Sequence, residues 1–144
     1  MKRKAKTLIV DDSKAVLYMM NGILNDYGLN EICEAANGLL AVEQFEAAAR
    51  SGAPFSLVFL DIVMPVMNGQ EALKRMRDIE MDAGVIGDDR AIIIMATSLH
   101  STTDMIDAMI EGDCTDYLIK PFDPEDLLGM LIKYGYVDRA DGQT

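Results

Sequence analysis

The chain has 144 residues, half of them hydrophobic, which is enough for one folded domain with a core and argues against disorder. The net charge of −11, with basic residues clustered only near the start, argues against a nucleic-acid-binding protein. No apolar run approaches the roughly 18–20 residues of a membrane span, and the first run is too short for a signal peptide, so we expect a cytoplasmic protein without membrane insertion.

Short apolar runs alternate with helical patterns along the whole chain. The apolar runs, read as strands, are 7–10, 31–35, 55–60, 91–96 and 117–119. Apolar residues at helical spacing predict helices at 14–27, 38–50, 70–81, 102–111 and 124–134, and 82–90 reads as an exposed loop. This alternation predicts an α/β fold, a doubly wound (βα)5 unit with a five-stranded parallel sheet. We expect a single domain over residues 1–144, with a core at about 6–134 and a polar tail at 136–144.

The third run is the most informative, because it is apolar throughout and leads directly into Asp61. A buried parallel strand ends at the carboxyl edge of its sheet, where α/β proteins bind their ligands. Asn68 then suits the N-cap of the next helix, as Asp123 does for the last one. Taken alone, Asp61 could equally be a strand-ending residue that faces solvent, so the other strand ends decide its interpretation.

Polar side chains follow three other strands as well: Asp11 and Asp12 the first, Thr97 the fourth and Lys120 the fifth. Because the carboxyl ends of parallel strands meet at one edge, we expect all of them to converge on Asp61. Two carboxylates 4 Å apart repel by about 1 kcal/mol in water and about 4 at an effective dielectric of 20, which a bound Mg²⁺ would offset. A metal, an ammonium and a hydroxyl around a carboxylate suit phosphoryl transfer to that carboxylate. Each residue also has an ordinary structural interpretation, and only their joint occurrence indicates this chemistry.

Five segments together resemble the receiver domain of two-component response regulators, particularly the single-domain, chemotaxis-type receivers. They are LIVDDS (8–13), EAANG (34–38), LVFLDIVMPVMNG (57–69), IIIMATS (92–98) and DYLIKPF (116–122). The resemblance implies a flavodoxin-like three-layer sandwich with strand order 2-1-3-4-5. It also implies a cis peptide bond between Lys120 and Pro121.

The resemblance implies that Asp61 is the phosphoacceptor and that the metal is Mg²⁺ or Mn²⁺. Asp12 matches the direct metal ligand, Asp11 matches the acid that reaches the metal through water, and Asp61 is a ligand as well. The backbone carbonyl of Val63 would complete the protein ligands. No other cofactor is implied.

The remaining site residues would transmit the signal. Thr97 and Lys120 would bind phosphoryl oxygens, and Tyr117 matches an aromatic switch residue that moves as Thr97 is drawn towards the phosphate. The change would alter a face made by the fourth helix, the fifth strand and the fifth helix. Met105 could offer an adaptable contact for a partner there.

The resemblance therefore implies a stand-alone response regulator rather than a turnover enzyme. A sensor histidine kinase or a histidine phosphotransfer protein would phosphorylate it, and it would then bind a downstream protein target. It would be a monomer or a dimer that phosphorylation favours.

The chain departs from the family pattern at positions that matter. Val63 and Leu99 are apolar where many receivers place polar side chains near the attacking water, so we expect slow hydrolysis of the phosphate. Asp113 stands where a glycine is common, and an aspartate tolerates the left-handed conformation better than most residues do.

Three alternatives stay open. The chain could be a receiver-like interaction module that works without phosphorylation. It could be a phosphohydrolase with an aspartyl nucleophile, although such enzymes commonly need a second acid where Val63 stands. It could be a flavin carrier, although Asp11 and Asp12 would repel the cofactor phosphate.

Overall fold

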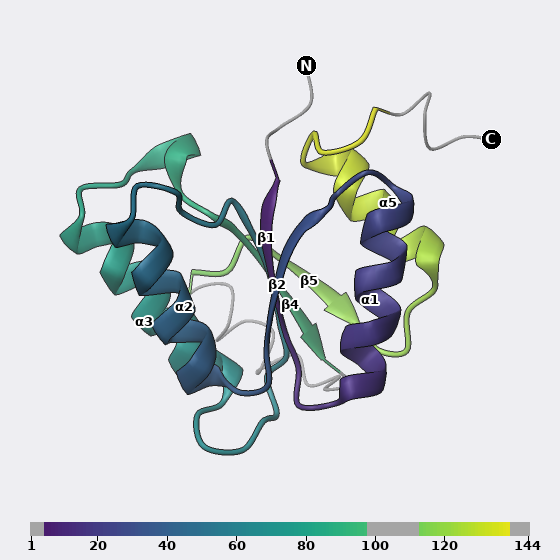
Figure 1. The fold of residues 1–144 in the computed structure, drawn as a ribbon, viewed down its shortest axis with the longest axis horizontal. Helices are drawn as coiled ribbons and strands as arrows, with labels where there is room; N and C mark the ends of the chain where they lie inside the picture. The colour runs from purple at the N-terminus through teal and green to yellow at the C-terminus, as the bar shows by residue number, and fades with distance from the viewer. Residues whose placement is uncertain (1–4, 98–112, 139–144) are drawn as a thin grey trace.

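The computed structural model describes residues 5–97 and 113–138, and it confirms the predicted alternation of strands and helices (Figure 1). The strands are β1 (Lys6–Val10), β2 (Glu31–Ala35), β3 (Leu57–Leu60), β4 (Ile92–Thr97) and β5 (Asp116–Ile119). The helices are α1 (Lys14–Asp26), α2 (Gly38–Arg50), α3 (Gly69–Asp82) and α5 (Pro124–Lys133), with a short 3-10 helix at Gly87–Asp89. The helix expected at 102–111, including Met105, lies outside the described residues.

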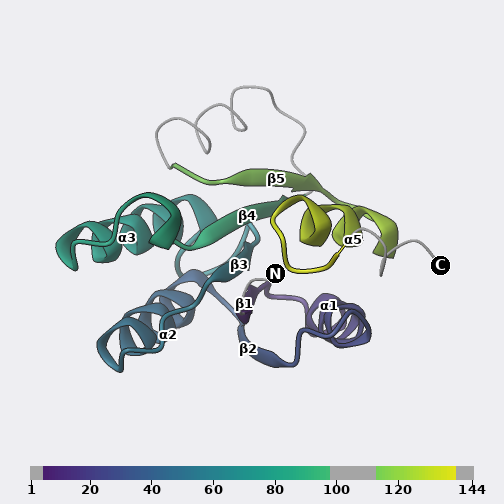
Figure 2. The same cartoon turned by 90° about the horizontal axis from the view of Figure 1, so that it is seen from above.

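The five strands form one parallel sheet in the order β2-β1-β3-β4-β5, which confirms the doubly wound fold. Figure 2 shows α1 and α5 covering one face of the sheet and α2 and α3 covering the other. Among the described residues, no helix is long and apolar enough to cross a membrane.

Two apolar clusters, one on each face, hold these layers together. One contains Phe45, Val58 and Met76 and lies under α2 and α3, and the other contains Leu24, Phe59 and Leu127 and lies under α1 and α5. All four residues of β3 are buried, because the strand is central and helices cover both of its faces. This burial explains why its sequence is apolar throughout rather than alternating.

Local hydrogen bonds start the helices close to the carboxyl edge of the sheet. The side chain of Asn37 accepts the Leu40 amide at 2.9 Å, and that of Asn68 accepts the Glu71 amide at 2.9 Å. Asp123 begins α5 with a capping box, as its sequence predicts. The loops that follow β2 and β3 are therefore bounded by fixed helix starts.

The predicted polar tail is wrong for its first two residues, since Tyr136 and Val137 are only 3% and 5% exposed. After α5 the chain turns back at Gly135, and the Tyr136 amide donates to Leu131 O at 2.8 Å. The Tyr136 hydroxyl reaches Ser56 O at 3.0 Å, so the core includes this segment. The described chain starts at β1 and ends after α5 on the same side of the molecule, opposite the loop that follows β3 (Figure 1).

Candidate functional site

The sheet brings the predicted site residues together because its register aligns the ends of neighbouring strands. Val10 of β1 pairs with Leu60 of β3, so Asp11 and Asp61 leave adjacent strands at the same level. The Asp61 amide donates to Val10 O at 3.1 Å, which fixes the backbone of Asp61 beside β1. Lys120 follows β5 directly and its side chain reaches both acids.

Three carboxylates and one ammonium form this cluster. The Nζ atom of Lys120 donates to Asp11 Oδ2 in a short hydrogen bond and lies 3.5 Å from Asp61 Oδ2. Asp11 and Asp61 are 3% and 7% exposed, whereas Asp12 is exposed at the rim. Two buried acids therefore form the floor of the cluster, and a third acid faces solvent above them.

Burial raises the pKa of the Asp61 carboxyl group above its usual value. The charge of Lys120 lowers this pKa in part, the charge of Asp11 raises it further, and hydrogen bonds from Lys120 and from the backbone of Val63 lower it. The ionised form of Asp61 therefore depends on positive charge at the site.

The cluster fits a hard divalent cation. One oxygen from each of Asp11, Asp12 and Asp61 can lie within 4.8 Å of the others. Three carboxylates and the single ammonium of Lys120 leave two negative charges uncompensated, which a divalent cation such as Mg²⁺ would neutralise. Carboxylate oxygens are also the ligands that Mg²⁺ prefers.

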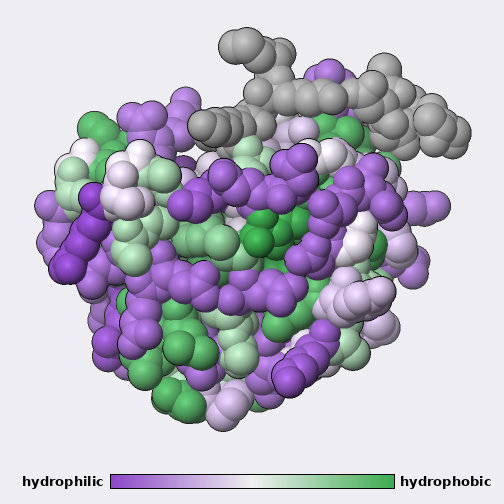
Figure 3. Space-filling view, in the orientation of Figure 1, coloured by the Kyte–Doolittle hydropathy of each residue, from purple (hydrophilic) through white to green (hydrophobic). Residues whose placement is uncertain are grey.

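The loop after Asp61 is closed at its base by Gly69. The Gly69 amide donates to Ile62 O at 2.8 Å, and a Cβ atom at Gly69 would lie 2.0 Å from Asp61 O. Only glycine allows α3 to start this close to the backbone of Asp61. The loop exposes apolar side chains, with Val63 60% and Val66 76% exposed, and apolar surface gathers where the loop lies at the lower rim of Figure 3.

Two further predicted residues lie on the strands next to this cluster. Thr97 ends β4 and pairs with Ile119 of β5, while its side chain lies outside what the structure describes. Tyr117 of β5 is 8% exposed and belongs to the core cluster under α2 and α3. The Lys120-Pro121 bond is cis, as the resemblance implied.

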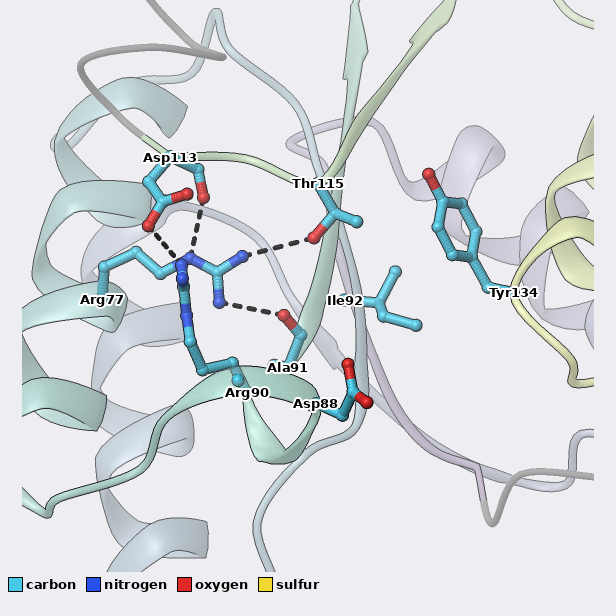
Figure 4. A pocket seen from close by; sticks show the side chains of 9 residues that line it. Arg77, Asp88, Arg90, Ala91, Ile92, Asp113, Thr115 and Tyr134 are labelled. Carbon is cyan, nitrogen blue, oxygen red and sulfur yellow. Dashed lines mark hydrogen bonds and ion pairs between the residues drawn. The ribbon is translucent and has the colours of Figure 1, made fainter.

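A second polar cluster, which the sequence did not indicate, lies around Arg77 where β4 and β5 begin (Figure 4). Arg77 donates to Glu80 Oε1 at 2.7 Å, to Ala91 O at 2.9 Å and to Asp113 O at 2.8 Å. Asp113 has the left-handed conformation expected of it, with φ 62°. Arg90 pairs with the Asp113 carboxylate, so the hollow of about 320 Å³ beside both arginines offers no uncompensated charge to an anion.

A third group of polar side chains ties β5 to the end of α5. Asp116 accepts hydrogen bonds from Lys133 Nζ at 2.6 Å, from the Tyr134 hydroxyl and from the Tyr117 amide at 2.8 Å. Burial raises the pKa of Asp116, but these hydrogen bonds outweigh burial and hold the pKa below its usual value. Hydrogen bonds from the end of α5 therefore hold the start of β5, the strand that carries Tyr117.

The chain is similar to known proteins over most of its length. The sequence model of the family described as response regulator receiver domain matches residues 7–132. Chemotaxis protein CheY of Bacillus subtilis is 34% identical over 128 residues, which cover 89% of this chain and 95% of that protein. Protein PilH of Pseudomonas aeruginosa is 35% identical over 125 residues, which cover 86% and 92%.

Solved structures agree with these matches. The chemotaxis protein CheY4 of Vibrio cholerae has a TM-score of 0.74 at 32% identity and covers 92% of this chain and 99% of that one. A chain of the CheX-CheY-BeF3-Mg complex of Borrelia burgdorferi has a TM-score of 0.75 at 26% identity, covering 90% and 87%.

Proposed function

Because the chain belongs to the response regulator receiver domain family, we propose that phosphorylation of Asp61 switches it between two signalling states. The observation that carries this proposal is the setting of Asp61, a nearly buried carboxylate 3.5 Å from the Lys120 ammonium and close to Asp11 and Asp12. Positioning and charge neutralisation are the main requirements of phosphoryl transfer, and this setting supplies both.

In the proposed step, a carboxylate oxygen of Asp61 attacks the phosphorus of a phosphohistidine or of a small acyl phosphate. The bond between this oxygen and phosphorus forms as the donor's bond to phosphorus breaks, and the donor keeps the electron pair of that bond. Asp11, Asp12, Asp61 and the Val63 carbonyl would hold Mg²⁺, which supplies positive charge for the phosphoryl oxygens. Lys120 would contact a phosphoryl oxygen, since its Nζ lies near Asp61 Oδ2.

The phosphoryl group would act on the rest of the domain through Thr97 and Tyr117. It adds about −1.5 to −2 charges at neutral pH, and the Thr97 hydroxyl would donate to it. A change from 1:99 to 99:1 needs about 5.5 kcal/mol, and a few charge-assisted hydrogen bonds of about 1.5–3 kcal/mol each come close to that. Tyr117 would follow Thr97 and change the surface of β5 and α5.

The partners that fit this role are a histidine kinase or phosphotransfer protein as donor and a protein target for the phosphorylated form. The Borrelia complex joins a CheY to CheX, which supports a protein as the target here. The −11 net charge supports a protein rather than a nucleic acid. The site would transfer a phosphoryl group to itself and release it slowly, without turnover of a substrate.

Slow loss of the phosphoryl group is part of the proposal. The exposed side chain of Val63 is apolar, as is Leu99, and neither can orient an attacking water. Phosphorylated protein freed of donor should therefore persist longer than a Val63→Asn variant, whose amide can bind that water. Decay that is equally fast in both proteins would contradict this reasoning.

The central test is the intact mass of the protein after incubation with acetyl phosphate. One added phosphoryl group is expected with Mg²⁺, and none with chelator or in Asp61→Asn. Asp89→Asn, which changes an exposed acid in the loop before β4, is the matched control and should still be modified. No gain of mass in a folded wild-type protein would leave an interaction module that works without phosphorylation.

A further inference from the structure

We propose that Gly38, the first residue of α2, is a positioning residue for the phosphorylation site. The proposal rests on the function proposed for Asp61 and concerns the loop at 61–69, between β3 and α3. Gly38 touches neither the acids nor Lys120 in any hydrogen bond or ion pair of the described residues. Its effect would pass through the backbone of this loop.

Gly38 meets the loop backbone to backbone. Its amide donates to Met67 O at 3.1 Å, and a Cβ atom at Gly38 would lie 2.4 Å from Met67 O and 3.1 Å from Asn68 O. The three atoms nearest to that Cβ position all belong to the backbone of Met67 and Asn68, so a larger residue would have to push apart α2 and the loop. The contact therefore sets how closely the loop approaches α2.

The residue held by this contact closes a tight turn. The Met67 amide donates to Pro65 O at 2.8 Å across Val66, whose φ of 70° is rare for a β-branched residue. The Val66 side chain is 76% exposed, so burial of this side chain contributes little to holding the conformation. Met67 is 6% exposed, so its buried side chain and the bond from Gly38 keep the strained turn in place.

On the other side of the turn, the loop runs back through Val63 to Asp61. The Val63 side chain is exposed and contributes little to placing its own backbone, whereas its neighbours Ile62 and Met64 are buried. The Val63 backbone in turn makes a hydrogen bond to the Asp61 carboxylate. Gly69 closes the base of the loop on Ile62, and Gly38 holds Met67 near its α3 end, so both contacts limit where the Val63 backbone groups lie.

Replacing Gly38 by alanine tests this path. Gly38→Ala should weaken Mg²⁺ binding in calorimetry by about tenfold and slow modification by acetyl phosphate at saturating Mg²⁺ by a similar factor, as is usual for groups that orient ligands from outside a metal site. Gly22→Ala is the matched control, because Gly22 also lies in a helix but a Cβ atom there meets nothing within 4 Å. Leu24→Val lowers stability on the other face of the sheet and controls for a general loss of stability.

A measurement on the unaltered protein covers the case in which Gly38→Ala does not fold. If Mg²⁺ binds only when the contact between Gly38 and Met67 is closed, hydrogen exchange of the Gly38 amide should slow about tenfold at a Mg²⁺ concentration ten times Kd. The Leu40 amide, which is bound to Asn37 in the same turn of α2, is the control and should slow much less.

The outcomes separate this proposal from the one it rests on. Equal Mg²⁺ affinity and equal modification rates in Gly38→Ala and Gly22→Ala would overturn the role of Gly38 while the function of Asp61 stands. Equal slowing of the Gly38 and Leu40 amides would overturn it as well. A wild-type protein that takes up no phosphoryl group would overturn the function, and the Mg²⁺ and exchange measurements would still decide the role of Gly38.

Discussion

Lys120 is the cation that offsets two buried acids, and its removal should have effects of opposite sign on metal binding and on phosphorylation. We consider Lys120→Met, which keeps much of the side-chain length but removes the charge. The lysine side chain is 19% exposed and contacts Asp11 and Asp61, whose side chains are 4% and 10% exposed. Breaking a buried pair costs about 3–5 kcal/mol, and partial solvent access reduces this, so we expect a loss of about 2–3 kcal/mol without metal.

Metal binding should become tighter in the same variant. Lys120 occupies Asp11 Oδ2 and lies 3.5 Å from Asp61 Oδ2, so it competes with a cation for both acids and repels it. A unit charge about 5 Å from Mg²⁺ repels it by about 1.5 kcal/mol even in water, which corresponds to roughly tenfold in Kd. Phosphorylation should nevertheless slow, since a positive charge near the phosphoryl oxygens is lost.

The assays are urea unfolding followed by circular dichroism in chelator, calorimetric titration with Mg²⁺, and mass spectrometry after acetyl phosphate treatment. Lys74→Met, which changes an exposed lysine of α3, is the matched control and should behave as wild type in all three. Mg²⁺ binding that is weaker in Lys120→Met than in wild type would refute the competition inferred here, because a disrupted site would lose both activities together.

Three further substitutions test the structure away from this cluster. Arg77→Met should lower the free energy of unfolding by about 3–5 kcal/mol, because the carboxylate of Glu80, which is 6% exposed, loses its nearest cation. A loss below about 1 kcal/mol in urea unfolding would contradict this expectation. Thr7→Val should raise the free energy of unfolding by about 1 kcal/mol, since the buried Thr7 hydroxyl has no hydrogen-bond partner among the described residues. A lower thermal midpoint in Thr7→Val than in wild type would argue against this expectation. The pKa of Asp116 is lower in the folded than in the unfolded state, so ionised Asp116 contributes to the free energy of unfolding. This contribution is complete above about pH 4 and is lost as the pH falls through the folded-state pKa. The stability difference between wild type and Asp116→Asn should therefore shrink only in acid, and a difference that changes between pH 6 and 8 instead would exclude this assignment.

Strand ends and helix starts could be predicted from the sequence because their signals are local. Asp61 follows a fully apolar run, and Asn68 and Asp123 stand where an N-cap is needed. Parallel strands then bring their carboxyl ends together whatever the details of packing, so the approach of Lys120 to Asp61 followed from the fold class alone.

Burial that depends on distant partners could not be predicted in this way. In α3 the charged Glu80 is 6% exposed, whereas its apolar neighbour Ile79 is only partly buried. Glu80 is buried because it accepts the Ala91 amide at 2.6 Å and pairs with Arg77, and neither contact is visible in a helical pattern. Tyr136 was assigned to a polar tail for the same reason, since its partner Ser56 lies 80 positions away.

Both described ends of the chain lie on the side of the molecule opposite the acidic cluster, with β1 starting there and the segment after α5 packing beside Ser56 (Figure 1). A fluorophore or a surface tether attached beside either of these described ends would therefore lie on the side of the molecule away from Asp61 and from the loop that follows it. Immobilised protein would present its acidic cluster to solution, so binding of a phosphodonor could be followed in real time on a sensor surface without a tag obstructing the reaction.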